Sequence, residues 1–273
     1  MKSKRKADLA TIVGIVVALG GMVGGLILEG GSILDVGQFT AALIVLGGTV
    51  GAVMVNTPME VLIRACKRLF TVFLYTPISL GVIAEEIIGY ATKARKNGIV
   101  SLEQEVAEIQ DPFLRKTLNL AVDGADLQEL RNMMELEIAI EEHHVEAEAK
   151  VFESAGGYAP TIGIIGAVMG LIQVMKHLAN IDEVGHGIAV AFVATVYGVA
   201  LSNIFFLPVA NKIKARAHEE TERRELILEG VVSIVEGLNP KLIRTKLEIY
   251  ARHESVKKSA ALAEVPAAEK AVA

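Results

Sequence analysis

This 273-residue sequence has one cysteine, no tryptophan and few aromatic residues, and long stretches of it carry no charge. Its single cysteine, Cys66, cannot form a disulfide within the chain, and we expect it to be a free, inert thiol. Aromatic residues make up only 5%, and no stretch interleaves them with basic residues as a nucleic-acid surface would. The net charge is only −5, so we expect no nucleic acid among the partners.

The common catalytic motifs are also missing. The sequence contains no G-x-S-x-G, no phosphate-binding P-loop and no H-E-x-x-H. The stretch "GIIGAVMG" (163–170) lacks the spacing of a dinucleotide fingerprint. We therefore predict that the protein is not an enzyme and needs no cofactor.

Hydrophobic residues are abundant and concentrated. They make up 52% of the chain, and the mean hydropathy is +0.46, too apolar for an ordinary soluble domain. A helix needs about 20 residues to cross a bilayer. The first apolar run is longer than the core of a signal peptide, so we expect a retained anchor. The predicted membrane spans are about 9–28, 36–55, 158–176 and 188–210.

Lysine and arginine predict the orientation. Basic residues cluster at the N-terminus, after the second span and after the fourth, whereas the short loops "EGGSILD" and "HLANIDEVGHG" contain none. The sequence therefore predicts an all-α integral membrane protein with both termini in the cytoplasm. Its segments are the N-terminus with two spans (1–56), a helical cytoplasmic domain (57–155), two further spans (156–210), cytoplasmic C-terminal helices (211–253) and a disordered tail (254–273).

Local signals divide the cytoplasmic insert into helices. Ser101 with Gln104 forms a possible capping box, and Asp111 followed by Pro112 is a strong helix start. Gly98 and Gly124 act as stop signals. A long charged helix is predicted from 126 to 154, ended by the glycines at 156 and 157.

One candidate metal set lies on that charged helix. In "EEHHVEAE", Glu141 and His144 form an E-x-x-H, and Glu148 lies one turn further. A di-iron bundle site needs a second such motif on a facing helix. The other one, Glu183 to His186, falls in the loop predicted on the opposite side of the membrane. We therefore expect a solvated helix face and no metal site.

Small residues and prolines pattern the spans. Pro160 stands near the start of the third span, and Pro208 near the end of the fourth should kink it; both could be structural or act as hinges. Glycines four residues apart allow helix backbones to approach closely, within the chain or against another one. These pairs are Gly20 and Gly24, Gly21 and Gly25, Gly47 and Gly51, and Gly166 and Gly170.

The spans contain no ionisable residue in their interiors. Ion and proton pathways usually depend on such groups, so the chain alone is a poor pump. The hydroxyl of Thr195, in "AFVATVYGVALSN" (191–203), could line a pathway whose acid comes from a partner helix. The alternative is that it hydrogen-bonds to its own helix, which is common in membranes and which spacing alone favours.

Several longer stretches resemble one family. The layout of two hairpins around a cytoplasmic insert, together with "YAPTIGIIGAVMGLI" (158–172), "AVAFVATVYGVALSNIFFLPVANKI" (189–213), "VDGAD" (122–126) and "ILEGVVSIVEGLNPKLI" (227–243), resembles the MotA-type stator subunits of the bacterial flagellar motor. The wider MotA/TolQ/ExbB group includes members with three spans, and the four-span count separates this chain from them.

The resemblance implies a mechanism and partners. MotA-type subunits form a homopentamer around two copies of a MotB-like protein, which supplies an essential aspartate. The ring turns as ions pass and pushes on the rotor switch protein FliG. By position, Arg95 and Glu103 correspond to the rotor-facing charges, Pro160 and Pro208 to the prolines of conformational coupling, and Thr195 to the threonine beside the ion path.

The resemblance also bears on the ion. Sodium-driven relatives have an extra threonine at the positions of Ala167 and Ala194. A sodium ion that sheds water needs several oxygen ligands, whereas a proton needs only a titrating group and hydrogen bonds. We therefore expect protons to be the transported ion. The alternatives are a sodium-driven stator and a membrane scaffold that conducts nothing.

Overall fold

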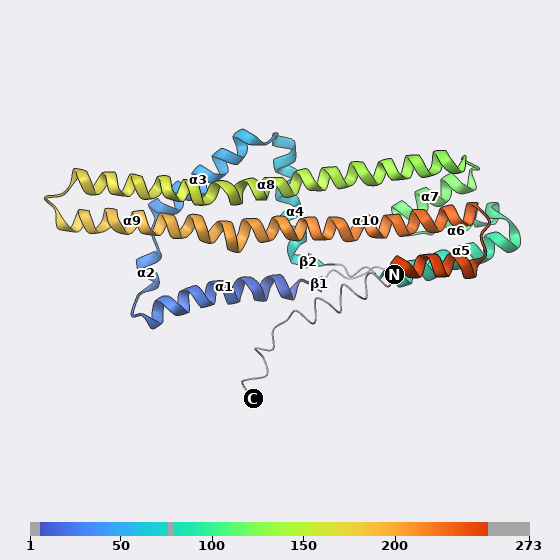
Figure 1. Cartoon of the computed structure of the whole chain (residues 1–273), viewed down its shortest axis with the longest axis horizontal. Coiled ribbons are helices and arrows are strands. Elements are labelled where there is room, and N and C mark those ends of the chain that lie inside the picture. Colours follow the sequence, from blue (N-terminus) through green and yellow to red (C-terminus); the bar gives the residue numbers. More distant parts are fainter. Residues whose placement is uncertain (1–5, 76–78, 251–273) are drawn as a thin grey trace, which may run out of the picture. The chain divides into compact units, whose positions relative to one another are not determined.

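The computed structural model describes residues 6–75 and 79–250, almost entirely as helices (Figure 1). The predicted C-terminal tail and the first basic residues lie outside this described part. The chain forms two compact units, the first from Met1–Pro77 and His143–Ala217 and the second from Ile78–Glu142 and His218–Ala273. The all-α prediction is confirmed, and four helices are long and apolar enough to cross a membrane. They are α1 (Leu9–Leu28), α3 (Phe39–Asn56), α8 (Leu127–Lys176) and α9 (Ile181–Ala200) with its continuation.

The first half of the first unit consists of two apolar helices and an amphipathic one. α1 starts at the N-cap Asp8, and the turn α2 (Ile33–Val36), closed by a capping box of Ser32 and Asp35, leads into α3. α4 (Met59–Phe73) follows, and a two-residue antiparallel pairing of β1 (Lys6–Ala7) with β2 (Leu74–Tyr75) joins its end to the start of α1. None of the residues of α1 is buried within the described chain.

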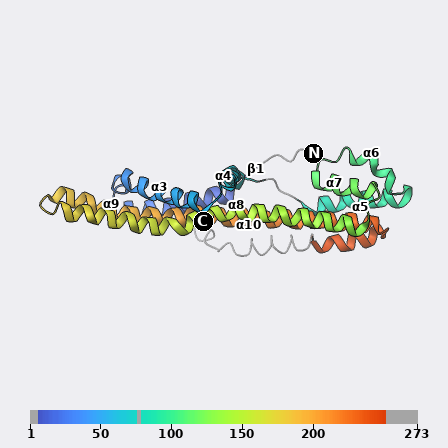
Figure 2. The ribbon, with the colours of Figure 1, turned by 90° about the horizontal axis from the view of Figure 1, so that it is seen from above.

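The rest of the first unit is a helical hairpin. The second part of α8 and α9 run side by side in both views (Figures 1 and 2). α3 packs on this hairpin through one buried stripe, Ala41, Val45, Thr49 and Val53, spaced four residues apart. The hydroxyl of Tyr197 donates to the carbonyl oxygen of Val36 at 2.5 Å and ties α9 to the turn before α3.

The second unit buries a separate apolar core. α5 (Leu80–Asn97) leads through the 3-10 turn η1 (Ile99–Leu102) and the short α6 (Glu103–Val106) to α7 (Pro112–Val122). The first part of α8, the end of α10 (Leu207–Val235) and helical residues 240–250 complete it. The predicted insert and the predicted C-terminal helices therefore share one core, whose largest fully buried side chains include Ile87, Leu118, Met134, Ile227 and Leu247.

Local signals in the second unit are partly confirmed. Asp111 caps α7 by accepting from the amides of Phe113 and Leu114, with Pro112 in the first turn, as predicted. Gly98 and Gly124 both have positive φ, +81° and +79°, and follow the ends of α5 and α7. The predicted capping box at Ser101 is wrong, because the Ser101 hydroxyl donates to the Gly98 carbonyl and α6 begins without a side-chain cap.

Two predicted helix ends in the first unit are also wrong. α8 does not stop at Gly156 but continues through Pro160 as one helix of 50 residues. α9 begins at Ile181, inside the predicted loop, because the Asn180 side chain caps it and Asp182 and Glu183 stand in its positively polarised first turn.

Candidate functional site

The contact between α8 and α9 is made by glycines and alanine. A β-carbon added at Gly198 would stand 2.5 Å from the carbonyl oxygen of Ala159, and one at Gly163 would stand 2.8 Å from that of Ala194. Nearer the hairpin turn, a β-carbon at Gly170 would stand 2.7 Å from the carbonyl oxygen of Gly187. The two backbones therefore touch along this seam, which we call the glycine seam (Gly163, Gly166, Gly170, Gly187 and Gly198).

The predicted glycine pairs differ in what they contact. Gly166 and Gly170 belong to the glycine seam. The other pairs, Gly20 and Gly24, Gly21 and Gly25, and Gly47 and Gly51, have room for a β-carbon with no described atom within 4 Å. These three pairs are therefore not used for packing among the described residues.

Adding one methyl group to the glycine seam should destabilise the first unit. We expect Gly198→Ala to lower the free energy of unfolding by about 1–3 kcal/mol, because the Ala159 carbonyl would have to move. Gly185→Ala is the matched control on the same helix, where a β-carbon meets no described atom and alanine should stabilise by about 0.5–1 kcal/mol. Thermal unfolding of the purified protein in detergent measures both, and equal midpoints would contradict the seam.

The alanines predicted to govern ion choice lie in different surroundings. Ala194 is 0% exposed and belongs to a small core with Ala41 and Val45 of α3. A β-carbon added at Gly166 would meet that of Ala194 at 2.8 Å, so the side chain of Ala194 faces the chain's own helices. Ala167 is half-buried. A threonine at 194 would need space beside Gly166.

Thr195 is half-buried, and its hydroxyl donates to the carbonyl of Ala191, one turn back, at 3.2 Å. This is the local hydrogen bond that the sequence favoured for it. Donation uses the hydroxyl hydrogen and leaves both lone pairs of the oxygen free to accept. The residue can therefore accept a hydrogen bond from a water or a neighbouring group without losing its bond to the helix.

Pro160 leaves a gap in the hydrogen bonding of α8, which another helix fills. Proline has no N–H, so the carbonyl of Gly156, four residues back, loses its usual helical donor. The Ser202 hydroxyl donates to that carbonyl at 2.7 Å, and Ser202 itself is 2% exposed. This bond, joining residues 46 positions apart, explains how α8 passes through a proline without ending.

Pro208 follows an irregular segment. Between α9 and α10 the chain forms a π-helical turn, η2 (Leu201–Phe206), and Pro208 is the second residue of α10. π-turns and prolines are the usual sites at which helices bend. Gly156 packs directly on this segment, since a β-carbon there would stand 2.6 Å from a methyl carbon of Leu207. The irregular parts of the third and fourth predicted spans are therefore in direct contact.

Arg216 of α10 joins three elements at the base of α1. Its guanidinium donates to the Asp8 carboxylate at 2.7 Å and to the carbonyls of Val72 at 2.8 Å and Leu74 at 3.1 Å, and also to that of Thr71. Lys212 contacts the same Asp8 oxygen at 2.8 Å. We call this group the Asp8–Arg216 clasp. Burial alone would raise the pKa of Asp8, but hydrogen bonds from Lys212, the Thr11 amide and Arg216 outweigh it and lower that pKa to about 2.

The predicted rotor-facing charges lie on the surface of the second unit. Arg95 is exposed in the last turn of α5, and Glu103 is exposed in the first turn of α6, as the sequence predicted. Lys93 and Glu105 connect the same two helices by an exposed ion pair of 2.7 Å. The η1 turn joins α5 to α6, so Arg95 and Glu103, which have opposite charges, lie on either side of it on an exposed edge.

The residues weighed as a candidate metal set lie in different surroundings. Glu148 is 3% exposed and pairs with Arg64 at 3.4 Å and with Arg68, both on α4. The prediction of a solvated face is therefore wrong for Glu148, because α4 covers it, although His144 is exposed. Within residues 6–75 and 79–250, no group of three metal-ligating side chains is close enough to hold an ion.

Ser202, Asp8 and Arg216 were not predicted from the sequence. A proline in an apolar span signals that a carbonyl lacks a donor, and Ser202 is one of the few hydroxyls in the spans that could supply one. The clasp could have been inferred from Asp8, which directly precedes the first span, and from the basic residues that directly follow the fourth span.

Comparisons with known proteins agree with the resemblance. The family model described as the MotA/TolQ/ExbB proton channel family matches residues 105–226, and the model described as the Motility protein A N-terminal region matches residues 12–85. Motility protein A of Bacillus subtilis is 37% identical over 247 residues, covering 89% of this chain and 90% of that protein.

Solved structures are similar along almost the whole chain. The structure of C. jejuni MotAB matches with a TM-score of 0.85 and 33% identity, covering 89% of this chain and 95% of that one. The flagellar MotAB stator complex from Bacillus subtilis matches with a TM-score of 0.83 and 35% identity, covering 91% of this chain and 98% of that one.

Proposed function

Because the chain belongs to the MotA/TolQ/ExbB proton channel family, we propose that it is a flagellar stator subunit that passes protons and converts their flow into torque on the rotor. The observation that carries this proposal is the likeness to two MotAB complexes over about nine-tenths of the chain. The chain also has four helices long and apolar enough to cross a membrane, and the spans predicted within them contain no ionisable residue in their interiors. Such a chain needs an acid from elsewhere to move protons. A MotB-like single-span partner with an essential aspartate is the natural source.

The remaining parts of the proposal follow from the family's arrangement. The chain forms a homopentamer in the inner membrane, with both termini and the second unit in the cytoplasm. The outward-facing glycine pairs of α1 and α3 support close packing on further helices. Arg95 and Glu103 lie on the surface that meets FliG, and their exposure supports that role.

In this proposal Thr195 lies beside the proton path, and Pro160 and Pro208 couple proton transfer to movement of the ring. The Ser202 bond and the contact of Gly156 with Leu207 support coupling between the two prolines, because the irregular segments cannot move independently. The alanines at 167 and 194 favour protons over sodium, since they offer no side-chain oxygen.

Thr195 tests the ion path. We expect Thr195→Ala in the cell's own chromosome to lower motor speed about tenfold, the equivalent of one lost transition-state hydrogen bond, and Thr195→Ser to keep most of it. Thr92→Ala is the matched control, because the half-buried Thr92 hydroxyl also donates to the carbonyl one turn back, at 2.8 Å, but outside the spans. Normal speed in Thr195→Ala cells would contradict a role in the path.

The same cells identify the ion. A proton-driven motor stops when a protonophore is added and is insensitive to external sodium. A speed that follows external sodium would establish the sodium-driven alternative. Normal motility after deletion of the gene would contradict a stator role and favour the alternative of a membrane scaffold that conducts nothing.

A further inference from the structure

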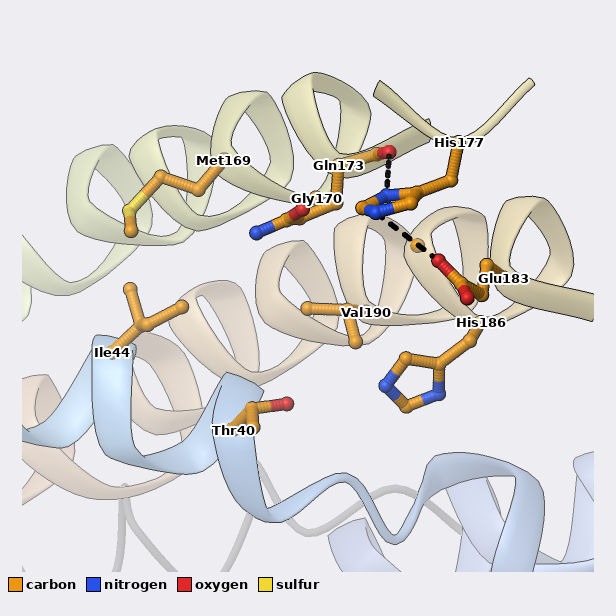
Figure 3. Close-up of a pocket in the computed structure, with 10 residues that line it drawn as sticks. Thr40, Ile44, Met169, Gly170, Gln173, His177, Glu183, His186 and Val190 are labelled. Atoms are coloured by element: carbon orange, nitrogen blue, oxygen red, sulfur yellow. Dashed lines mark hydrogen bonds and ion pairs between the residues drawn. The ribbon is translucent and has the colours of Figure 1, made fainter. Parts of the chain in front are cut away.

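A polar recess lies at the end of the hairpin opposite the predicted cytoplasmic side (Figure 3). Its volume is about 440 Å³, and α3, α8 and α9 each form one wall. Apolar side chains such as Ile44, Met169 and Val190 form part of its lining. Its polar residues are Thr40, Gln173, His177, Glu183 and His186.

The hydrogen bonds of His177 fix the position of one proton. The Nδ1 atom lies 3.1 Å from the carbonyl oxygen of Gln173, and Nε2 lies 3.3 Å from a carboxylate oxygen of Glu183 (Figure 3). Carbonyl and carboxylate oxygens can only accept, so both contacts are hydrogen bonds only when both ring nitrogens carry a hydrogen. In the neutral tautomer that keeps its hydrogen on Nδ1 for the Gln173 carbonyl, Nε2 is the atom that can gain a proton, and it faces the Glu183 carboxylate.

Glu183 is placed to remain the anionic partner. Its other carboxylate oxygen accepts from the Asn180 amide at 3.0 Å, and the residue stands in the first turn of α9, where the helix dipole favours negative charge. The remaining charged or titratable residues of this hairpin end are Lys176 on α8 and Asp182 and His186 on α9, whereas α3 adds only Thr40 and Ile44 to the lining.

The pair is also open to water, since the side chains of His177 and Glu183 are 46% and 51% exposed. Histidine is the side chain that ordinarily changes charge between pH 5 and 8. We propose that this recess is the outer proton-binding site of the stator, where His177 takes up a proton at Nε2 beside Glu183 and releases it toward the membrane path. The inference rests on the proposed function and orientation.

The step is balanced within the pair. A proton from external water bonds to the Nε2 lone pair and gives an imidazolium next to the carboxylate. When that N–H bond breaks, the proton passes to water or to the next acceptor, and His177 returns to its neutral form with Nδ1 still bonded to Gln173. No other co-reactant is needed. The negative charge of the Glu183 carboxylate favours binding of a proton in the recess over binding of an anion.

The test separates proton supply from torque. In cells whose own gene is replaced by His177→Gln, we expect rotation at low load to fall at least about twofold above pH 7, where protons are scarce and the outer site speeds their capture. At pH 5.5 and near stall, speed and torque should equal those of the wild type, because proton supply no longer limits rotation. Glu183→Gln, which keeps an acceptor for Asn180, should have the same effect.

His143→Gln, an exposed histidine outside the recess, is the matched control and should run as the wild type does at every pH. The inference is overturned if His177→Gln and Glu183→Gln behave like this control. It is also overturned if they lose torque equally at all pH values, since that indicates damage to the hairpin. Wild-type motility that survives deletion of the gene, or that follows sodium, would instead overturn the proposed function.

Discussion

Replacing Ser202 with alanine is expected to lower the free energy of unfolding by about 1–3 kcal/mol. The cost arises because the buried Gly156 carbonyl, already without a helical donor at Pro160, would lose the hydrogen bond from the Ser202 hydroxyl at 2.7 Å. A carbonyl left unpaired in an apolar interior retains the full penalty of its desolvation. Thermal unfolding of the purified protein in detergent would measure the loss.

A double-mutant cycle makes this prediction specific. In a Pro160→Ala background, residue 160 regains an N–H that can bond to Gly156, so Ser202→Ala should cost clearly less there. Ser233→Ala is the control, because Ser233 is also buried and donates to a carbonyl, that of Glu229 at 2.8 Å, in an uninterrupted helix. Equal costs of Ser202→Ala in both backgrounds would show that the hydroxyl does not compensate for the proline.

Removal of the Arg216 guanidinium should also lower the free energy of unfolding by a large amount. We expect Arg216→Ala to destabilise the first unit by about 2–4 kcal/mol, because Asp8 and the carbonyls at the end of α4 lose a shared donor that is largely shielded from water. Arg216→Lys should recover only part of the loss, since an ammonium group cannot reproduce the planar fork.

The same clasp predicts the response to acid. The pKa of Asp8 is lowered from 3.8 to about 2, so its contribution to stability is fully present above pH 3.8 and is lost as the pH falls through 2. Asp8→Asn should remove this acid dependence, which is up to about 2 kcal/mol. Unfolding midpoints measured between pH 2 and 6 would show it.

The exposed pair of Lys214 and Glu153, on the same unit, provides the control for the clasp. Lys214→Ala should change stability by less than about 1 kcal/mol, because solvent screens an exposed pair. If Arg216→Ala were as mild as Lys214→Ala, the clasp would be a surface contact and not the element that fixes the base of α1.

The features predicted correctly from the sequence are those decided within one or two turns of chain. Long apolar runs indicated the four candidate spans, and Asp111 with Pro112 identified the start of α7, because a cap is a contact between neighbours in sequence. The end of the helix at Gly156 was predicted wrongly for the same reason: locally, two glycines and a proline favour a stop.

Contacts with residues distant in the sequence allow α8 to continue past Gly156 despite this local preference. The Ser202 hydroxyl and the Leu207 side chain lie more than 40 positions away in the chain and reach Gly156 only in the folded hairpin. Glu148 is a similar case, since nothing in "EEHHVEAE" indicates that α4 covers one of its acids with two arginines. For the candidate site, the sequence placed Thr195 and the prolines but not the groups that support them.

The glycine seam sets limits on how this sequence can change over time. At Gly163 and Gly198 the neighbouring backbone occupies the space that any larger residue would need. A substitution at either position therefore requires α8 and α9 to move apart. Between these two glycines in the sequence, Ile164, Ile165 and Val168 are about half exposed and meet no such restriction. Contacts within the described chain therefore limit residue size on the inner face of α8 but not on its outer face.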